Sequence, residues 1–212
     1  MLGIIFQSRP RKQDVNASDI ARLRLPNGLG GSRHERRVAA IAVKLFDLLQ
    51  EQHGLTAEYR NLLRIAALLH DAGRVYGAQG HDVRGAQMVL EDRSIRLSPR
   101  ERRGAAYLVR FHRGPVPACL QDQDILLAGD KHRKLRILLG ILRASDALDS
   151  RRLVPTAIIM KLGPRKLRIN CLVESSLKEA KRRLGGRRKF ALLESEMGFA
   201  VKLQFKDLLP TA

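Results

Sequence analysis

The spacing of apolar residues along the chain predicts a protein built mainly from α-helices. After Ser32, apolar residues recur every three to four positions up to Gly54, which is the period of an amphipathic helix. These residues are Val38, Ile41, Ala42, Leu45 and Leu49. A second helix is expected to begin at Thr56 and to carry His70 and Asp71 at its end. Similar patterns predict helices over 81–92, 99–112 and 131–149, and a short helix over 16–25 that ends at "PNGLGG".

The pattern changes after Arg152 from helical periodicity to short apolar runs. "TAIIMKL" and "KLRINCLV" predict two strands joined by "GPR", and "FAVKLQF" predicts a last strand. Residues 176–198 between them are expected to be helical, interrupted or bent at Gly185 and Gly186 and capped by Gly198. We therefore predict a mainly α fold in three parts. They are an N-terminal segment over 1–30, a helical bundle over 31–152 and a small α+β subdomain over 153–212.

Composition supports the helical prediction and bears on the location of the protein. Aromatic residues make up only 4% of the chain and Trp is absent, which favours packed helices over a β-sandwich. No apolar run reaches the length of a membrane span, and the first residues lack the features of a signal peptide. Cys119 and Cys171 form no CxxC pair, as is usual for thiols in a reducing compartment. We expect a cytoplasmic protein without a membrane partner.

The formal net charge of +19 predicts an anionic partner. The run "KRRLGGRRK", over 181–189, is either a solvated helix face or a surface that contacts polyphosphate or RNA. Single-stranded nucleic acid usually stacks on aromatic side chains, and these are scarce here. We therefore expect a phosphate-rich small molecule or polyphosphate as the partner. Nucleic acid is the alternative anionic partner, and a second copy of the chain is a further candidate partner.

Several polar residues fall on the apolar stripes of the predicted helices and should point inward. His34 shares a face with Ile41 and Leu45, and His70 and Asp71 end an apolar run. His81, His112 and Asp146 lie on the stripes of three further helices. One inward histidine is usually a hydrogen-bonded core residue. Five or six together indicate a divalent metal site, because imidazole and carboxylate groups are its usual ligands and the metal offsets their burial.

The order His34, His70-Asp71, Asp146 resembles the H…HD…D signature of the HD superfamily of metal-dependent phosphohydrolases. The likeness rests on "RHERRVAAIAVKLF", "AALLHDAGR" and "LLGILRASDALD". From Ser32 to the end, the sequence is more closely similar to the C-terminal HD segment of the exopolyphosphatase/guanosine pentaphosphate phosphohydrolase (Ppx/GppA) family. The resemblance implies an HD-domain helical bundle with a metal site.

In that family the phosphatase chemistry lies in an N-terminal actin-like portion with glycine-rich phosphate loops, and these 212 residues contain no such portion. We therefore do not carry over the exopolyphosphatase activity itself. The resemblance to the wider superfamily implies a metal-dependent phosphohydrolase that acts on a nucleotide, a polyphosphate or another phosphoester or phosphoanhydride. The alternative is a noncatalytic module that binds polyphosphate or RNA and holds a structural metal.

The resemblance also assigns roles to individual residues. His34, His70, Asp71 and Asp146 are the expected ligands of one or two ions of Mn, Fe, Co, Ni or Mg. His81 and His112 are candidates for a second metal or for phosphate binding, or else hydrogen-bonded core residues. HD enzymes with two metals often have a second histidine directly after the one that corresponds to His112. This sequence has Arg113 at that position.

The remaining candidates are arginines and one further aspartate. Asp71 and Arg74 are the expected catalytic residues, and Arg74 lies where related enzymes place a lysine that faces substrate phosphate. Arg74, Arg113 and Arg143 are the candidate phosphate ligands, with a solvated surface position as the alternative. Asp149 either orients a metal ligand or pairs with Arg151 or Arg152.

Overall fold

The computed structural model describes residues 20–24, 33–116, 131–150, 153–174, 176–184 and 186–207. Cys119, Gly185, Arg151 and Arg152 lie outside these ranges, as does most of the segment between the fourth and fifth predicted long helices. Within them, the first part of the chain folds into helices that follow the predicted periodicity. They are α1 (Arg33–Leu48), α2 (Gln50–His53), α3 (Ala57–Leu69), the 3₁₀ turn η2 (Ala72–Tyr76), α4 (His81–Glu91), α5 (Pro99–Phe111) and α6 (Lys131–Ala147).

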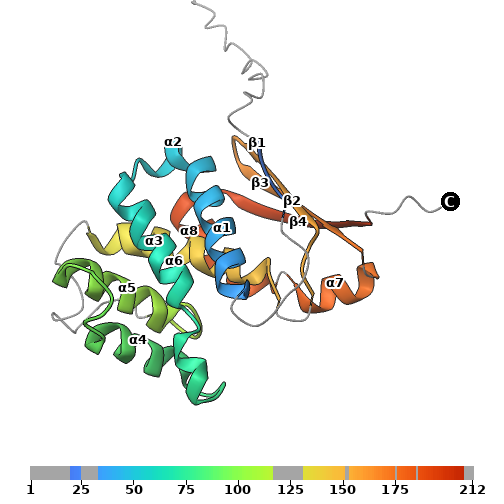
Figure 1. Ribbon diagram of the computed structural model, residues 1–212. Coiled ribbons are helices and arrows are strands. Elements are labelled where there is room, and N and C mark those ends of the chain that lie inside the picture. Colours follow the sequence, from blue (N-terminus) through green and yellow to red (C-terminus); the bar gives the residue numbers. More distant parts are fainter. Residues whose placement is uncertain are drawn as a thin grey trace, which may run out of the picture.

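These helices pack around a continuous apolar core. Figure 1 shows α1, α3, α4, α5 and α6 gathered on one side of the sheet, with α1 next to it. The core residues without exposed surface include Ile41, Leu45, Leu63, Leu108 and Leu142, one or two from each of four helices. No described helix is long and apolar enough to cross a membrane. The prediction of a mainly α fold with a small C-terminal α+β part is confirmed.

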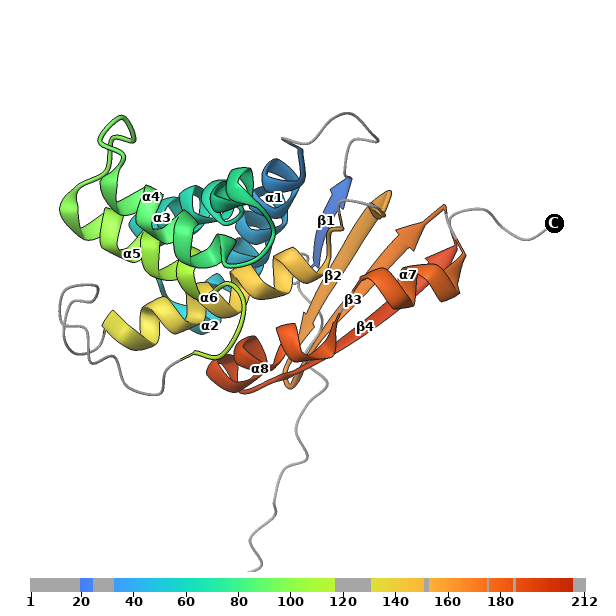
Figure 2. The ribbon, with the colours of Figure 1, turned by 90° about the horizontal axis from the view of Figure 1, so that it is seen from below.

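The described part of the C-terminal region contributes three strands to a four-stranded sheet of order β1-β2-β3-β4. The strands β2 (Ala157–Gly163) and β3 (Lys166–Val173) form the predicted antiparallel hairpin, and β4 (Ala200–Asp207) pairs parallel to β3. Alternate residues of β2 and β3 are buried, as expected for a sheet with one covered face. The helices α7 (Leu177–Arg183) and α8 (Ala191–Met197) connect β3 to β4, with the 3₁₀ turn η3 (Arg187–Lys189) between them. Figure 2 shows α7 beside the sheet and α8 beneath α6.

The prediction of a short helix over 16–25 is wrong for the part that the structure describes. Residues Ile20–Arg24 form strand β1, which pairs antiparallel with β2 from Ile20 opposite Lys161 to Arg24 opposite Ala157. An isolated short helix is unstable in water, whereas the edge of β2 offers unpaired backbone groups to an extended segment. Residues 16–19 and 25 lie outside the described ranges.

The predicted helix ends agree with the structure where capping residues mark them. Ser98 and Glu101 form a reciprocal capping box at the start of α5, with Pro99 in the first turn. Gly198 has a φ of 70° and ends α8 in the left-handed conformation, which glycine adopts without strain. The interruption predicted around Gly185 and Gly186 agrees with the structure, in which α7 and α8 are separate short helices with η3 between them.

The C-terminal part is attached to the bundle by a close contact between α6 and α8. A Cβ atom on Gly140 would lie 2.9 Å from Leu193 Cα, so the absence of a side chain at this position lets the two helices touch. Arg136 Nε also donates to Glu196 Oε1 at 2.7 Å across the same contact. This packing places η3, which directly precedes α8, near the C-terminal end of α6.

Candidate metal centre

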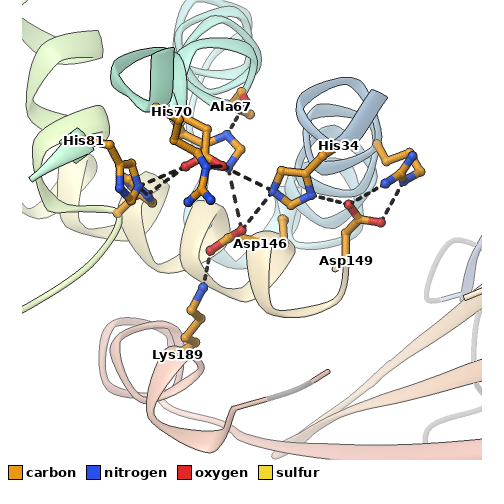
Figure 3. Close-up of polar contacts among 12 residues, drawn as sticks. His34, Ala67, His70, His81, Asp146, Asp149 and Lys189 are labelled. Atoms are coloured by element: carbon orange, nitrogen blue, oxygen red, sulfur yellow. Dashed lines mark hydrogen bonds and ion pairs between the residues drawn. The ribbon is translucent and has the colours of Figure 1, made fainter. Parts of the chain in front are cut away.

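Three of the predicted ligands converge from three helices of the bundle. His34 lies in the first turn of α1, His70 directly follows α3, and Asp146 lies in the last turn of α6. One donor atom from each lies within 4.8 Å of the others. Asp146 Oδ1 is 3.3 Å from His34 Nε2 and 3.7 Å from His70 Nε2. Figure 3 shows these side chains pointing toward one another, and we call them the first donor cluster.

A second donor cluster adjoins the first and consists of Asp71, His81 and His112. Asp71 Oδ1 is 3.0 Å from His81 Nε2 and 3.8 Å from His112 Nε2. The other oxygen of Asp71, Oδ2, is 3.9 Å from the Nε2 atoms of both His34 and His70. Asp71 therefore faces both clusters, one with each carboxylate oxygen.

Backbone carbonyls fix the tautomers of three of these histidines. The Nδ1 atoms of His70, His81 and His112 each donate to a carbonyl oxygen three residues earlier, at 2.7 Å, namely those of Ala67, Ala78 and Val109. A carbonyl oxygen only accepts hydrogen bonds, so Nδ1 carries the proton in each ring. Each neutral ring therefore presents the lone pair of Nε2 to the clusters, which is the usual arrangement of metal-binding histidines.

These Nε2 lone pairs face one another, and no N–H or O–H group in the described part of the chain lies between them to form a hydrogen bond. The Nε2 atoms of His81 and His112 are 3.3 Å apart, although both accept rather than donate. Among the described residues His70 Nε2 is buried without a hydrogen-bond partner. An orphaned buried polar atom is costly, and a cation in each cluster would satisfy the nitrogen and oxygen atoms that surround it. The donor set of imidazoles and carboxylates therefore fits divalent metal ions.

His34 is oriented by Asp149, as one of the two interpretations of Asp149 predicted. Its Nδ1 bonds to Asp149 Oδ2, which leaves Nε2 to face the first donor cluster. Asp149 also accepts from Arg37, whose Nε lies 2.8 Å from Oδ1 and whose second donor lies 3.1 Å from Oδ2. The Asp149 side chain has no exposed surface, so Arg37 balances its charge inside the protein. The alternative pairing of Asp149 with Arg151 or Arg152 falls on residues outside the described ranges.

The pKa values of the metal-free site divide it into a charged part, with His34 and Asp146, and a neutral part, with His112. Burial acts to lower the pKa of His34, but hydrogen bonds with Asp146 and Asp149 outweigh it and raise the pKa to about 9. Burial acts to raise the pKa of Asp146, yet the neighbouring imidazoles of His34 and His70 and the charge of Lys189 hold it well below its usual range. Burial, followed by the neighbouring His70, lowers the pKa of His112 to about 4. His112 is therefore neutral at pH 7 and able to act as a ligand.

A cavity of about 370 Å³ opens over both clusters and is edged by cationic side chains. Arg74 and Arg113 line it from the bundle, and Arg74 Nε is 3.6 Å from Asp71 Oδ2. Arg182, Arg183 and Lys189 line it from the C-terminal part. Part of the basic run over 181–189 therefore forms one wall of the same cavity, whereas Lys181 lines a different pocket.

The third predicted phosphate ligand, Arg143, does not line this cavity and binds backbone carbonyl groups instead. Its guanidinium group donates to the carbonyl oxygens of Phe111 and Gly114, with Nε 2.8 Å from the former. It thereby holds the end of α5 next to α6, and burial lowers its pKa. We therefore leave Arg143 out of the candidate site. The periodicity of α6 gave no sign that carbonyl groups at the end of α5 would take up this guanidinium group.

A glycine pair brings the second cluster together. Gly73 in η2 packs directly on the first turns of α4, and a Cβ atom there would lie 2.1 Å from the carbonyl oxygen of His81 and 2.5 Å from Gly85 N. A Cβ atom on Gly85 would in turn lie 3.2 Å from Gly73 N. This close approach sets His81 beside Asp71, two residues before Gly73.

Sequence reasoning did not find two polar partners of the site. Arg37 lies one turn after His34 on the same face of α1 and is buried, so its inward position could have been read from the helical spacing. Lys189 reaches the site from far along the chain, and its ammonium group bonds Asp146 Oδ2 (Figure 3). Only the contact between α6 and α8 brings these two residues together, so no local sequence pattern predicts the pair.

Comparison with known proteins agrees with the resemblance in the sequence. The family model described as Ppx/GppA phosphatase, domain III, matches residues 31–162. The matched region contains all six residues of the two donor clusters and Asp149, whereas Arg182, Arg183 and Lys189 lie beyond its end. No curated protein matches the chain.

Proposed function

Since the chain belongs to the Ppx/GppA phosphatase family through its domain III, we propose that it is a metal-dependent phosphohydrolase of the HD superfamily type. Its substrate is a phosphoester or phosphoanhydride, such as a nucleotide or a polyphosphate. The observation that carries the proposal is the pair of buried donor clusters that meet at Asp71, beneath a cavity edged with cations. Two metal sites side by side under an open cavity suit chemistry on a phosphate group. A purely structural metal site would instead be closed to ligands.

In this proposal the first donor cluster holds one divalent cation and the second donor cluster holds another. Bound there, such cations would neutralise phosphate charge and lower the pKa of a water molecule. The donor set includes four imidazole nitrogens, which favour Mn, Fe, Co or Ni over Mg, since Mg prefers oxygen ligands.

The chain's own residues do the remaining work. Arg74 and Arg113 bind phosphate oxygens at the cavity wall, because a guanidinium group matches two of them at once. Asp149 and Arg37 keep His34 in place, and the carbonyl of Val109 keeps His112 in the tautomer that presents Nε2. Both donor clusters are therefore preorganised by bonds that do not involve the substrate.

A substrate panel tests the proposal directly. Nucleotides, phosphomonoesters, phosphodiesters and polyphosphate are incubated with the protein and Mn²⁺, or with EDTA, and phosphate release is measured. We expect metal-dependent turnover that falls by at least about 100-fold in Asp71→Ala, because this carboxylate serves both clusters. Asp47→Ala is the matched control, since Asp47 is an exposed aspartate paired with Arg60 on the surface. Activity that survives Asp71→Ala or EDTA would contradict the proposal.

A noncatalytic polyanion-binding module is the second candidate function. The exposure of Arg182, whose side chain is 71% accessible, and the net charge of +19 favour binding of a long anion. This candidate predicts salt-dependent binding of polyphosphate or RNA without turnover of any substrate in the panel, and unchanged binding in Asp71→Ala.

A further inference from the structure

Lys189 places a positive charge of the chain's own on a carboxylate of the first donor cluster. Its ammonium group bonds Asp146 Oδ2, while Oδ1 of the same carboxylate faces the Nε2 atoms of His34 and His70 (Figure 3). The Asp146 side chain is 12% exposed and that of Lys189 is 36% exposed. Asp146 is therefore neutralised from the cavity side by a residue of the C-terminal part.

Two roles for this contact predict opposite effects on metal binding. As a positioning residue, Lys189 would hold Asp146 toward the histidines, and its loss would weaken metal binding. As a competing cation, it would oppose a divalent ion on the same carboxylate, and its loss would strengthen metal binding. Lys189 bonds one oxygen of Asp146 while the other faces the histidines, so an ion held by that second oxygen would lie only a few ångströms from the ammonium group. Repulsion between a single and a double positive charge at such a distance exceeds the gain from one hydrogen bond.

The surroundings of Lys189 allow its side chain to move without the backbone. The next residue, Phe190, is 3% exposed and belongs to the apolar core, so it anchors the chain at this point. The lysine side chain is flexible, carries a compact charge and lines the cavity that Arg74 and Arg113 also line. An ammonium group displaced from Asp146 therefore stays within the cavity, next to the arginines that suit a phosphate group.

Resting on the proposed metal centre, we infer that Lys189 and a divalent cation compete for Asp146, and that the displaced ammonium group becomes a phosphate ligand. Without metal, Lys189 neutralises Asp146. With metal bound, the same side chain turns to an anion in the cavity, so metal binding adds a cation to the phosphate-binding wall. The C-terminal part thereby responds to occupancy of a site built by the bundle.

Calorimetric titration of the EDTA-stripped 212-residue chain with Mn²⁺ tests this inference. We expect Lys189→Met to bind its first Mn²⁺ on the order of tenfold more tightly than the wild type, because no charged hydrogen bond has to break. Lys189→Arg retains a cation and should bind Mn²⁺ as the wild type does. Arg188→Met is the matched control, because Arg188 is exposed in the same turn and its loss changes the net charge equally. Unchanged or weaker Mn²⁺ binding by Lys189→Met would overturn the inference.

Inorganic phosphate supplies the second measurement. The Mn²⁺-loaded Lys189→Met protein should bind phosphate several-fold more weakly than the Mn²⁺-loaded wild type, and the Arg188→Met protein should not differ. Equal phosphate binding by all three proteins would overturn the phosphate-ligand half of the inference. If Lys189→Met does not fold without metal, Lys189→Gln keeps a polar side chain for the same comparison.

The two proposals fail in different ways. A wild-type protein that binds no Mn²⁺ refutes the metal-dependent function and the Lys189 inference with it. A wild-type protein that binds Mn²⁺ with an affinity that Lys189→Met shares refutes the inference alone. Thermal melts of the metal-free proteins confirm that each variant is folded before titration.

Discussion

Replacing Gly73 by alanine should remove the second donor cluster while leaving the first intact. Gly73 lies against the start of α4, and its added methyl group would meet the carbonyl oxygen of His81 at 2.1 Å and Gly85 N at 2.5 Å. Both obstacles are backbone atoms, which cannot rotate away as a side chain would. The turn η2 and helix α4 must therefore separate.

The size of the separation can be worked out from the same contacts. Carbon–oxygen contacts of this kind are ordinarily above 3 Å, so His81 must move by about 1 Å relative to η2. Metal–ligand distances tolerate only about 0.2 Å, so a shift of this size takes His81 Nε2 out of reach of an ion held by Asp71. Overpacking of this kind costs about 1–3 kcal/mol of the free energy of unfolding, which a folded domain can survive.

Metal stoichiometry is the assay that separates the two clusters. Elemental analysis and Mn²⁺ calorimetry should give two ions for each wild-type chain and one for Gly73→Ala. The affinity of the ion that Gly73→Ala retains shows whether it matches the tighter or the weaker ion of the wild type. Gly163→Ala is the control, because its nearest atom would be Lys166 O at 3.6 Å, an ordinary contact far from the site. Two ions bound by Gly73→Ala with wild-type affinities would refute the argument that this glycine sets the distance between His81 and Asp71.

Two further predictions concern the surroundings of His34. Asp149→Asn replaces a carboxylate that bonds both His34 and Arg37, so Mn²⁺ affinity should fall by about 10- to 100-fold; equal affinity would show that Asp149 does not orient the ligand. In the metal-free protein, hydrogen bonds raise the pKa of His34 from 6.5 to about 9, so its contribution to stability is complete below pH 6.5 and is lost as the pH rises through 9. Melting temperatures in EDTA should therefore fall over this range, and less so in His34→Gln; a wild-type melting temperature that rises instead would contradict this sign.

The helices and the donor residues were predictable because both follow from local periodicity. An inward polar residue on an apolar stripe is visible in the sequence at His34, His112 and Asp146, and the structure brings all three to one place. The hairpin of β2 and β3 and the caps at Ser98 and Gly198 also rest on short-range signals. Each of these features depends on residues within one or two turns of each other.

The features that sequence reasoning missed depend instead on distant pairings. Strand β1 forms because β2, more than 130 residues later, offers a free edge, and nothing within 16–25 reveals that edge. Arg143 is taken up by carbonyl groups at the end of α5, whose position follows only from the packing of α5 on α6. Lys189 meets Asp146 through the contact of α8 with Gly140. Periodicity identifies the inward face of a helix but not the residue that will face it.

The two halves of the site have different origins along the chain. All six donors of the clusters lie within the region that matches domain III, so the proposed metal chemistry is a property that this region carries. Three of the cavity's cations, Arg182, Arg183 and Lys189, lie beyond that region and reach the site only because α8 packs on α6. A ligand held by the donors alone would contact only the bundle, whereas a longer anion must also meet the C-terminal wall. In the proposed function, the C-terminal wall therefore adds contacts for a longer anion to those that Arg74 and Arg113 of the matched region offer.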